Sequence, residues 1–187
     1  MNDLSIAHRY TPLSVALHWL TLLLMVAIYA SIELHEAIPR GNPLRGAMED
    51  WHIYLGLCVF ALAIYRLLVN LKLSTPPITP TPPSWQLAIS KGLKVYLYIL
   101  MLLAPVLGWL YLSANDEAVS LFFLPLPPIA PVSEALAEFA AEAHEIMGLS
   151  GYLFIAIHAL AALYHHYLVK DDTLRRMLPK FLARKSS

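Results

Sequence analysis

The segment of residues 144–166 is apolar enough to lie in a lipid bilayer, yet it carries four histidines: His144, His158, His165 and His166. An imidazole removed from water needs a hydrogen-bond partner or a metal ion, and histidine also transfers protons readily near neutral pH. These residues therefore indicate chemistry inside a membrane: metal coordination, proton transfer or hydrogen bonding between helices.

The spacing of these histidines sets their relative positions. Fourteen residues separate His144 from His158. In an α-helix this spacing is roughly 21 Å along the axis and returns the side chain to within about 40° of its starting direction. The two imidazoles are therefore expected on one helix face at opposite depths of a bilayer. His165, seven residues after His158, lies near the same face, whereas His166 points elsewhere.

The elements that must position these histidines are four long apolar segments. Of the 187 residues, 58% are hydrophobic and only 14% are charged, whereas about 25% are charged in a typical soluble domain. Each segment approaches the roughly 20 residues with which a helix crosses a bilayer, and a helix satisfies its own backbone polar groups in lipid. The predicted spans are residues 13–32, 51–69, 95–113 and 146–169.

Proline interrupts the chain between these spans. Residues 75–84 (TPPITPTPPS) predict a stiff extended linker, and residues 120–133 are apolar but too rich in proline for a fifth span. Ser133 is the expected N-cap of a helix over residues 134–145 that leads into the fourth span. We expect one all-α domain, residues 1–187, folded as an integral membrane four-helix bundle.

Basic residues predict the orientation of the bundle. With a cytoplasmic N-terminus, the inner segments hold 11 of the 13 lysines and arginines, while ten of the 13 acidic residues lie outside. The positive-inside rule therefore predicts that both termini are cytoplasmic. The first apolar segment lacks a convincing small-residue cleavage site and is interpreted as a retained span. A net charge of zero gives no indication of a nucleic-acid partner.

This orientation pairs four histidines by depth. His18 and His158 are expected near the cytoplasmic side, and His52 and His144 near the outer side. Two imidazoles on facing helices, found twice, suit two haem irons that are each held from both faces and transfer single electrons. With Cys58 as its sole cysteine, the chain has no Cys-x-x-Cys-His motif for covalent haem attachment.

Two other interpretations of the histidines stay open. Each imidazole alone is compatible with a hydrogen bond to a neighbouring helix or with a proton path. A zinc or copper site is the second alternative, but such a site gathers its ligands at a single depth, not at two levels roughly 21 Å apart.

Several motifs resemble the bacterial cytochrome b561 family. They are RYTPLSVALHWL, PRGNPLRGAMEDWHIYLG, the PTPPS linker, APVLGW, and HEIMGLSGYLFIAIHALAALYHHYLVKDDTLRRMLP. The likeness covers essentially the whole chain and is nearest to the small members called superoxide oxidases. That resemblance implies a four-helix protein of the bacterial inner membrane with two b haems, which oxidises superoxide and passes the electron to ubiquinone.

The resemblance also implies residue roles. His18 and His158 would be the axial ligands of the inner haem, and His52 and His144 those of the outer haem. His165 occupies a position associated with the quinone site. There it would donate a hydrogen bond or a proton to the reduced ring.

Cationic residues complete the set of candidate site residues. Lys91, Lys94 and Arg9 lie at the cytoplasmic level as candidates for contacts with the quinone or a propionate, and snorkelling to lipid headgroups is the alternative for the lysines. Arg66 lies fourteen residues after His52, which places it on the same face at the depth of the inner pair. A guanidinium binds a carboxylate such as a haem propionate through two hydrogen bonds.

On the outer side, Arg40 and Arg45 are the candidates for propionate contacts or for attracting an anion. They face ten acidic residues, which gives the outer segments a net charge of −8. Superoxide is an anion and is attracted by a positive field, so this balance opposes the superoxide assignment. A second hypothesis is therefore an electron-transfer subunit that links a hydrogenase or dehydrogenase partner to quinone, with residues 114–143 as the contact loop. A haem-free, histidine-rich membrane protein is the third.

Overall fold

The computed structural model describes residues 9–73 and 75–179, and its framework is four long helices. They are α1 (Pro12–Ala37), α2 (Pro43–Lys72), α3 (Ser84–Ala114) and α4 (Glu134–Tyr164), and α4 continues as a five-residue π-helix, His165–Val169. All four are long and apolar enough to cross a membrane. The first three predicted spans lie inside α1, α2 and α3, and the fourth, residues 146–169, covers the later part of α4 and the π-helix.

Local sequence signals begin three of these helices. Thr11 caps α1 by accepting a hydrogen bond from the Ser14 N–H at 3.2 Å, and Asn42 caps α2 in the same manner. A proline follows each cap at the first helical position, where its missing N–H is not needed. Ser133 caps α4, as the sequence predicted, and residues 134–145 form one continuous helix with the fourth span.

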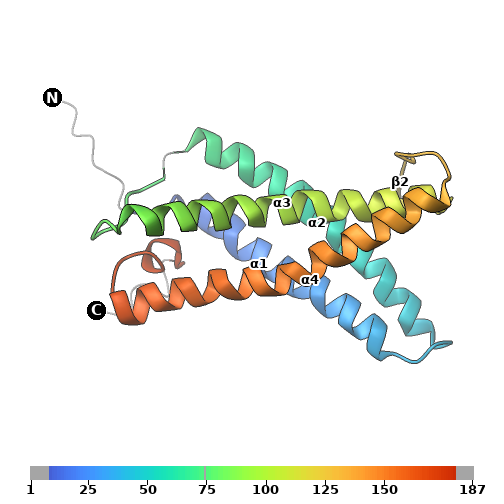
Figure 1. Cartoon of the computed structure of the whole chain (residues 1–187), viewed down its shortest axis with the longest axis horizontal. Coiled ribbons are helices and arrows are strands. Elements are labelled where there is room, and N and C mark those ends of the chain that lie inside the picture. The colour runs from blue at the N-terminus through green and yellow to red at the C-terminus, as the bar shows by residue number, and fades with distance from the viewer. Residues whose placement is uncertain (1–8, 74, 180–187) are drawn as a thin grey trace.

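The helices pack as two antiparallel hairpins. The α1–α2 hairpin crosses the α3–α4 hairpin at an angle, as Figure 1 shows, and the contact between the two runs mainly through α2 and α3. One small core joins Leu57 of α2 to Leu112 of α3, and another joins Val59 and Ala63 to Met101. Most large apolar side chains on the helices remain exposed, which suits a protein that lipid surrounds.

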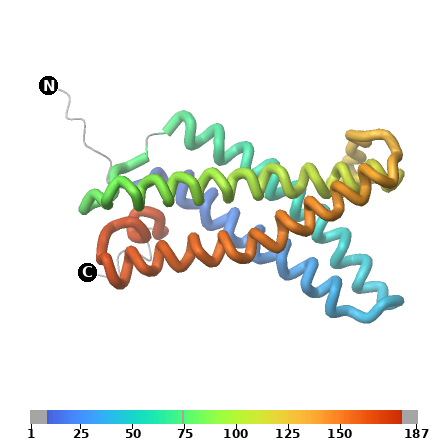
Figure 2. Tube along the Cα trace, in the orientation of Figure 1, coloured from blue at the N-terminus to red at the C-terminus, as the bar shows by residue number. Residues whose placement is uncertain are grey.

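The bundle has two distinct ends. At the first, which we call the tail end, the start of α1, the linker of residues 75–83 and the C-terminal segment of residues 170–179 lie together (Figure 2). Arg9 donates to the Leu178 carbonyl at 2.8 Å, and the Thr79 N–H donates to Asp172 at 3.0 Å. The opposite end, which we call the hairpin end, holds the α1–α2 turn and the loop between α3 and α4.

That loop contains a β-hairpin that the sequence analysis did not predict. Strands β1 (Val119–Leu121) and β2 (Leu124–Leu126) pair antiparallel, and Phe122 makes the turn with a φ of 54°. The Phe122 ring stacks on Tyr54 of α2, with centroids 5.1 Å apart. The proline-rich segment is no fifth span, as expected, but it folds back onto the bundle and does not run as a free loop.

A close approach of α1 to α4 depends on a glycine. The hydroxyl of Tyr29 in α1 donates to the Gly148 carbonyl at 2.8 Å, and the Tyr29 ring lies over the backbone of Gly151. A Cβ atom at Gly151 would lie 1.9 Å from the Tyr29 hydroxyl and 3.0 Å from Leu100. Only a residue without a side chain fits this position in the present packing.

Replacing Gly151 by alanine should therefore destabilise the bundle. Overpacking of this kind costs about 1–3 kcal/mol, and we expect a lower melting temperature for the purified Gly151→Ala protein in detergent. Gly92→Ala is the matched control, because nothing lies within 4 Å of a Cβ there. That control should be neutral or slightly stabilising, since alanine favours a helix by up to about 1 kcal/mol over glycine. Equal melting temperatures for the two variants would contradict the packing described.

Candidate functional site

At the hairpin end, His52 of α2 and His144 of α4 face each other. Their ring centroids are 5.9 Å apart. The Nδ1 atom of His144 donates to the Ala104 carbonyl at 2.8 Å, and that of His52 to the Ile28 carbonyl at 3.3 Å. A proton on Nδ1 leaves the lone pair of Nε2 free in both rings, which is the arrangement of a histidine that binds a metal.

The sequence of α3 provides the seat for the His144 ring. Ala104 supplies the carbonyl that holds Nδ1, and Gly108, one turn later, has no side chain at the place where the ring lies. A Cβ at Gly108 would lie 3.3 Å from two atoms of the imidazole. Pro105 stands between them inside the helix. This short stretch therefore both orients the histidine and makes room for it.

A cavity of about 590 Å³ surrounds the hairpin-end pair. Its volume falls within the roughly 300–1,000 Å³ range of cofactor and ligand sites. All four helices line it, and its walls are mainly apolar, with both histidines and the glycines Gly56, Gly108 and Gly148 among the lining residues. Four acids also line this cavity: Glu33, Glu36, Glu49 and Glu145.

At the tail end, His18 of α1 and His158 of α4 form the second pair. Their ring centroids are 6.1 Å apart. Arg66 of α2 reaches this pair, and its guanidinium donates to the Thr21 hydroxyl at 2.9 Å and contacts Nδ1 of His18 at 3.4 Å. It also lies 5.9 Å from the centre of the Tyr98 ring. Among the described residues, no carboxylate forms an ion pair with Arg66.

The structure thus brings together the histidines that the depth argument paired. Two imidazoles on opposite sides of one metal, each at the about 2.0–2.1 Å of a metal–imidazole bond, hold their ring centres roughly 6 Å apart. Both observed separations are close to that value. Within residues 9–73 and 75–179, no three histidine, cysteine or acidic side chains gather as a metal-binding cluster. The arrangement is one of two separate pairs.

Comparison with known proteins identifies the family. The family model described as prokaryotic cytochrome b561 matches residues 9–180. The chain belongs to the prokaryotic cytochrome b561 family. It is 34% identical to cytochrome b561 homolog 1 of Escherichia coli K12, over 92% of this chain and 98% of that protein. It is 33% identical to the probable superoxide oxidase CybB of Yersinia pestis, over 92% of this chain and 97% of that protein.

Membership of the cytochrome b561 family implies that this chain is a bacterial membrane protein that binds b-type haem and transfers electrons. The hairpin-end site fits such a group. It offers two imidazoles whose Nδ1 atoms are held by backbone carbonyls, an apolar cavity between the helices, and glycines where a flat ring system would approach the backbone. The chain is also 27% identical to cytochrome b562 of Cereibacter sphaeroides, over 90% of this chain and 94% of that protein.

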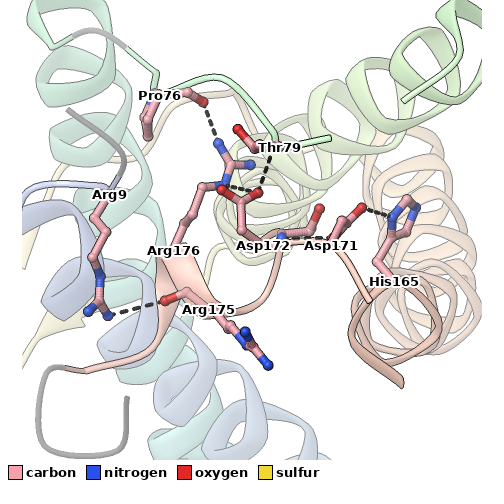
Figure 3. A network of polar contacts seen from close by, with 9 residues as sticks. Arg9, Pro76, Thr79, His165, Asp171, Asp172, Arg175 and Arg176 are labelled. Atoms are coloured by element: carbon pink, nitrogen blue, oxygen red, sulfur yellow. Dashed lines mark hydrogen bonds and ion pairs between the residues drawn. The ribbon is translucent and has the colours of Figure 1, made fainter. Parts of the chain in front are cut away.

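His165 lies at the tail end and has a partner that the sequence analysis missed. Its Nδ1 atom donates to a carboxylate oxygen of Asp171 at 2.5 Å (Figure 3). Burial alone would raise the pKa of the Asp171 carboxyl, but hydrogen bonds from the Thr173 N–H and from His165 outweigh burial and lower that pKa below its usual value. Asp171 therefore stabilises the folded tail as a carboxylate, and this contribution is lost only as the pH falls through the lowered pKa.

The other cations predicted for the cytoplasmic level lie apart from His165. Lys91 and Lys94 are exposed on α3. Because Tyr96 packs on Phe154 of the antiparallel α4, both lysines lie near the level of His158, which is deeper in the bundle than His165. Arg9 donates to the carbonyls of Arg175 and Leu178, at 3.1 and 2.8 Å, so its guanidinium holds the C-terminal segment.

At the hairpin end, neither arginine lines the cavity. Arg45 donates to the carbonyls of His35 and Ile38 at the end of α1, at 2.6 and 3.0 Å, and it also pairs with Glu36. Arg40 lies exposed in the turn. His35, which the sequence analysis did not single out, does line the cavity, and its Nδ1 donates a hydrogen bond to the Arg45 carbonyl at 3.0 Å. The sequence did contain a signal for this role, because His35 lies close to Glu33 and Glu36 just after the first predicted span.

The C-terminal segment at the tail end is held by a buried arginine. Arg176 is only 4% exposed; it donates to the Pro76 carbonyl and lies 3.4 Å from the Asp172 carboxylate (Figure 3). Its guanidinium also lies over the Tyr10 ring. The neighbouring Arg175 is exposed. One arginine of this adjacent pair therefore ties the segment to the linker, while the side chain of the other faces solvent.

Truncating Arg176 should release the C-terminal segment. Loss of a charged group that makes buried hydrogen bonds costs about 1–3 kcal/mol, so we expect chymotrypsin to cleave within residues 174–178 of Arg176→Ala about tenfold faster than in the parent protein. Arg175→Ala should be cleaved at the parent rate. Equal rates for both variants would show that the buried guanidinium does not hold the segment.

Proposed function

We propose that this protein is a superoxide:ubiquinone oxidoreductase of the bacterial inner membrane that carries two b haems. The tail end would face the cytoplasm, with both termini, and the hairpin end would face the periplasm. The reaction transfers two electrons: two superoxide anions each lose one electron and leave as O₂, and ubiquinone gains both electrons and two protons to become ubiquinol. The named relative that supports this proposal is the probable superoxide oxidase CybB of Yersinia pestis.

The observation that carries the proposal is the pair of imidazoles at each end of one bundle. Under it, His52 and His144 would hold the outer haem, and His18 and His158 would hold the inner haem. The two levels lie roughly 21 Å apart, because fourteen helical residues separate His144 from His158. When bound, haem with two axial imidazoles supplies one-electron chemistry without an open iron position. Two haems at these two levels would provide a route for electrons from one leaflet of the membrane to the other.

Arg66 is proposed to bind a propionate of the inner haem. A guanidinium at membrane depth needs an anionic or hydrogen-bonding partner, and it forms no ion pair with a described carboxylate. Its present contact with Nδ1 of His18, at 3.4 Å, requires that this nitrogen carry no proton. A propionate carboxylate would give Arg66 a stronger partner and allow Nδ1 of His18 to keep its proton, so that Nε2 faces the iron.

Ubiquinone reduction is assigned to the tail end. Reduction of a quinone consumes protons. The tail end contains His165, a titratable side chain on the same face of α4 as His144 and His158. Lys91, Lys94 and Arg9 are not needed as quinone contacts in this proposal. The lysines are exposed on α3 near the level of His158, and Arg9 is engaged with backbone carbonyls.

Haem content tests the ligand assignment directly. A pyridine haemochrome assay on the purified protein should give two b haems per chain, and His52→Ala or His158→Ala should lose one of them each. His166→Ala is the matched control, because it removes an imidazole at the tail end without touching either pair. Full haem content in His52→Ala would overturn the outer site, and one haem in the parent protein would overturn one pair.

A second candidate function is favoured by the acids around the outer cavity. Four glutamates line it, and Arg45 at the same end already pairs with Glu36. A negative rim attracts a cationic surface more readily than an anion. In this alternative the protein is an electron-transfer subunit that accepts electrons from a docked hydrogenase or dehydrogenase and delivers them to quinone.

The response of the rate to ionic strength separates these functions. Purified protein that is supplied with superoxide should reduce a short-chain ubiquinone analogue faster than His52→Ala does. If superoxide is the substrate, added salt should raise this rate or leave it unchanged, because salt screens the repulsive glutamates within roughly 8–10 Å. Transfer from a basic partner protein would instead slow as salt is added. No superoxide-dependent quinone reduction at any salt concentration would eliminate the first function.

A further inference from the structure

The contact between His165 and Asp171 is a second feature of the tail end with chemical consequences. The Asp171 carboxylate accepts a hydrogen bond from Nδ1 of His165 at 2.5 Å and another from the Thr173 N–H at 2.8 Å. Asp171 is only 3% exposed, and the His165 side chain is 14% exposed. A buried carboxylate that holds one ring nitrogen fixes the orientation of the imidazole and leaves the other nitrogen, Nε2, for a different partner.

The backbone holds this pair in place. The last turn of α4 widens into the π-helix that begins at His165, and Lys170 then reverses the chain with a φ of 61°. After this reversal the Asp171 N–H donates to the His165 carbonyl at 3.2 Å. Asp172 is bound at the same time to both backbone groups of Thr79 in the linker. The Asp171 carboxylate is therefore held in place by the backbone on both of its sides, at the helix end and at the linker, independently of its contact with the imidazole.

We propose that Asp171 is the positioning residue that makes His165 a proton donor for quinone reduction; this inference rests on the proposed function. In each transfer, the Nε2–H bond of a protonated His165 breaks, and the proton passes to a quinone oxygen that has received an electron. Asp171 stays deprotonated throughout and keeps accepting the hydrogen bond from Nδ1–H of His165. Water on the cytoplasmic side then returns a proton to Nε2, and a second transfer completes ubiquinol.

The surrounding charges favour this division of roles. From the C-terminal segment, Asp172 and Arg176 face each other as an ion pair, while Arg175 is exposed. The linker contributes Pro76 and Thr79, which do not titrate, and the segment before α1 contributes Arg9 and Tyr10, which contact other parts of the tail. On α4 itself, Tyr164 packs its ring edge against His165. Among the described residues, Asp171 is the carboxylate that contacts His165.

Substituting Asp171 by asparagine separates a structural from a chemical role. Asparagine keeps an oxygen that accepts the hydrogen bond from Nδ1, but it removes the negative charge that stabilises a protonated imidazole. The experiment reduces both haems chemically without oxygen, mixes the protein with a short-chain ubiquinone analogue, and follows haem reoxidation and proton uptake by stopped flow. We expect Asp171→Asn to slow both signals about tenfold or more at neutral pH, within the range of general acid catalysis.

The pH profile is the readout that a merely structural role would not change. The pH profile of Asp171→Asn should differ from that of the parent protein, because a neutral amide replaces the carboxylate that contacts Nδ1 of His165. Asp171→Glu, which retains the charge, should recover most of the rate. The control is Arg175→Ala, which removes an exposed charge of the same tail that contacts neither His165 nor Asp171. It should keep the parental rate and pH profile.

Three outcomes are decisive. If the parent protein reduces quinone and Asp171→Asn matches it in rate and pH profile, the role of Asp171 is wrong while the proposed function stands. If reduced parent protein passes no electrons to quinone, the proposed function fails and takes this inference with it. Should Asp171→Asn not fold, His165→Ala tests the same step: its rate should fall, and added imidazole should restore it. Failure of imidazole to restore the rate would overturn the inference.

Discussion

In lipid, every buried polar group must find its partner inside the protein, and this constraint organises the whole bundle. A helix satisfies its own backbone but not the side chains that it carries into the membrane. Four histidines and one arginine on the membrane-spanning helices therefore lie where other elements reach them. Two imidazoles lie against backbone carbonyls, and the guanidinium lies against a threonine hydroxyl, an imidazole and an aromatic ring.

The same constraint explains why the bundle is not packed uniformly. The α1–α2 and α3–α4 hairpins are each tightly paired and meet mainly along α2 and α3, so the α1–α4 side has few direct contacts. One of these contacts is the Tyr29 hydroxyl at Gly148, which is possible because Gly151 lacks a side chain. On either side of it, towards the two ends, lie the histidine pairs. The open side of the bundle is thus where a cofactor of the family has room.

The sequence predicted the parts of this structure that depend on local periodicity. Helix rise and rotation are constant, so the depth and face of His18, His52, His144 and His158 followed from counting residues along apolar runs. The Arg66 position followed in the same way. The prediction that the proline-rich residues 120–133 form no span was confirmed, but their β-hairpin was missed, because strands of three residues carry almost no periodic signal.

Counting residues along a helix could not predict contacts between segments that are distant in the sequence. Arg9 appeared as a site residue because of its charge and level, but it holds carbonyls more than 160 residues away, and that pairing is a property of the folded tail. Asp171 was counted only as an acid on the inner side. Its contact with His165 depends on the π-helix and on a left-handed Lys170, a conformation that usually selects glycine or asparagine. Nothing local in a lysine predicts that turn.

The two ends of the bundle differ in the chemistry that their side chains permit. At the hairpin end, the polar groups near the histidine pair include carboxylates, backbone carbonyls, tyrosine hydroxyls and the His35 imidazole. Oxidation of superoxide to O₂ requires no proton. At the tail end, a guanidinium lies beside one imidazole, and a second imidazole is joined to a buried carboxylate. Reduction of a quinone requires both electrons and protons at one place. Under the proposed function, one-electron input would take place at the hairpin end, and proton-coupled output would take place at the tail end, where the histidine–carboxylate pair lies.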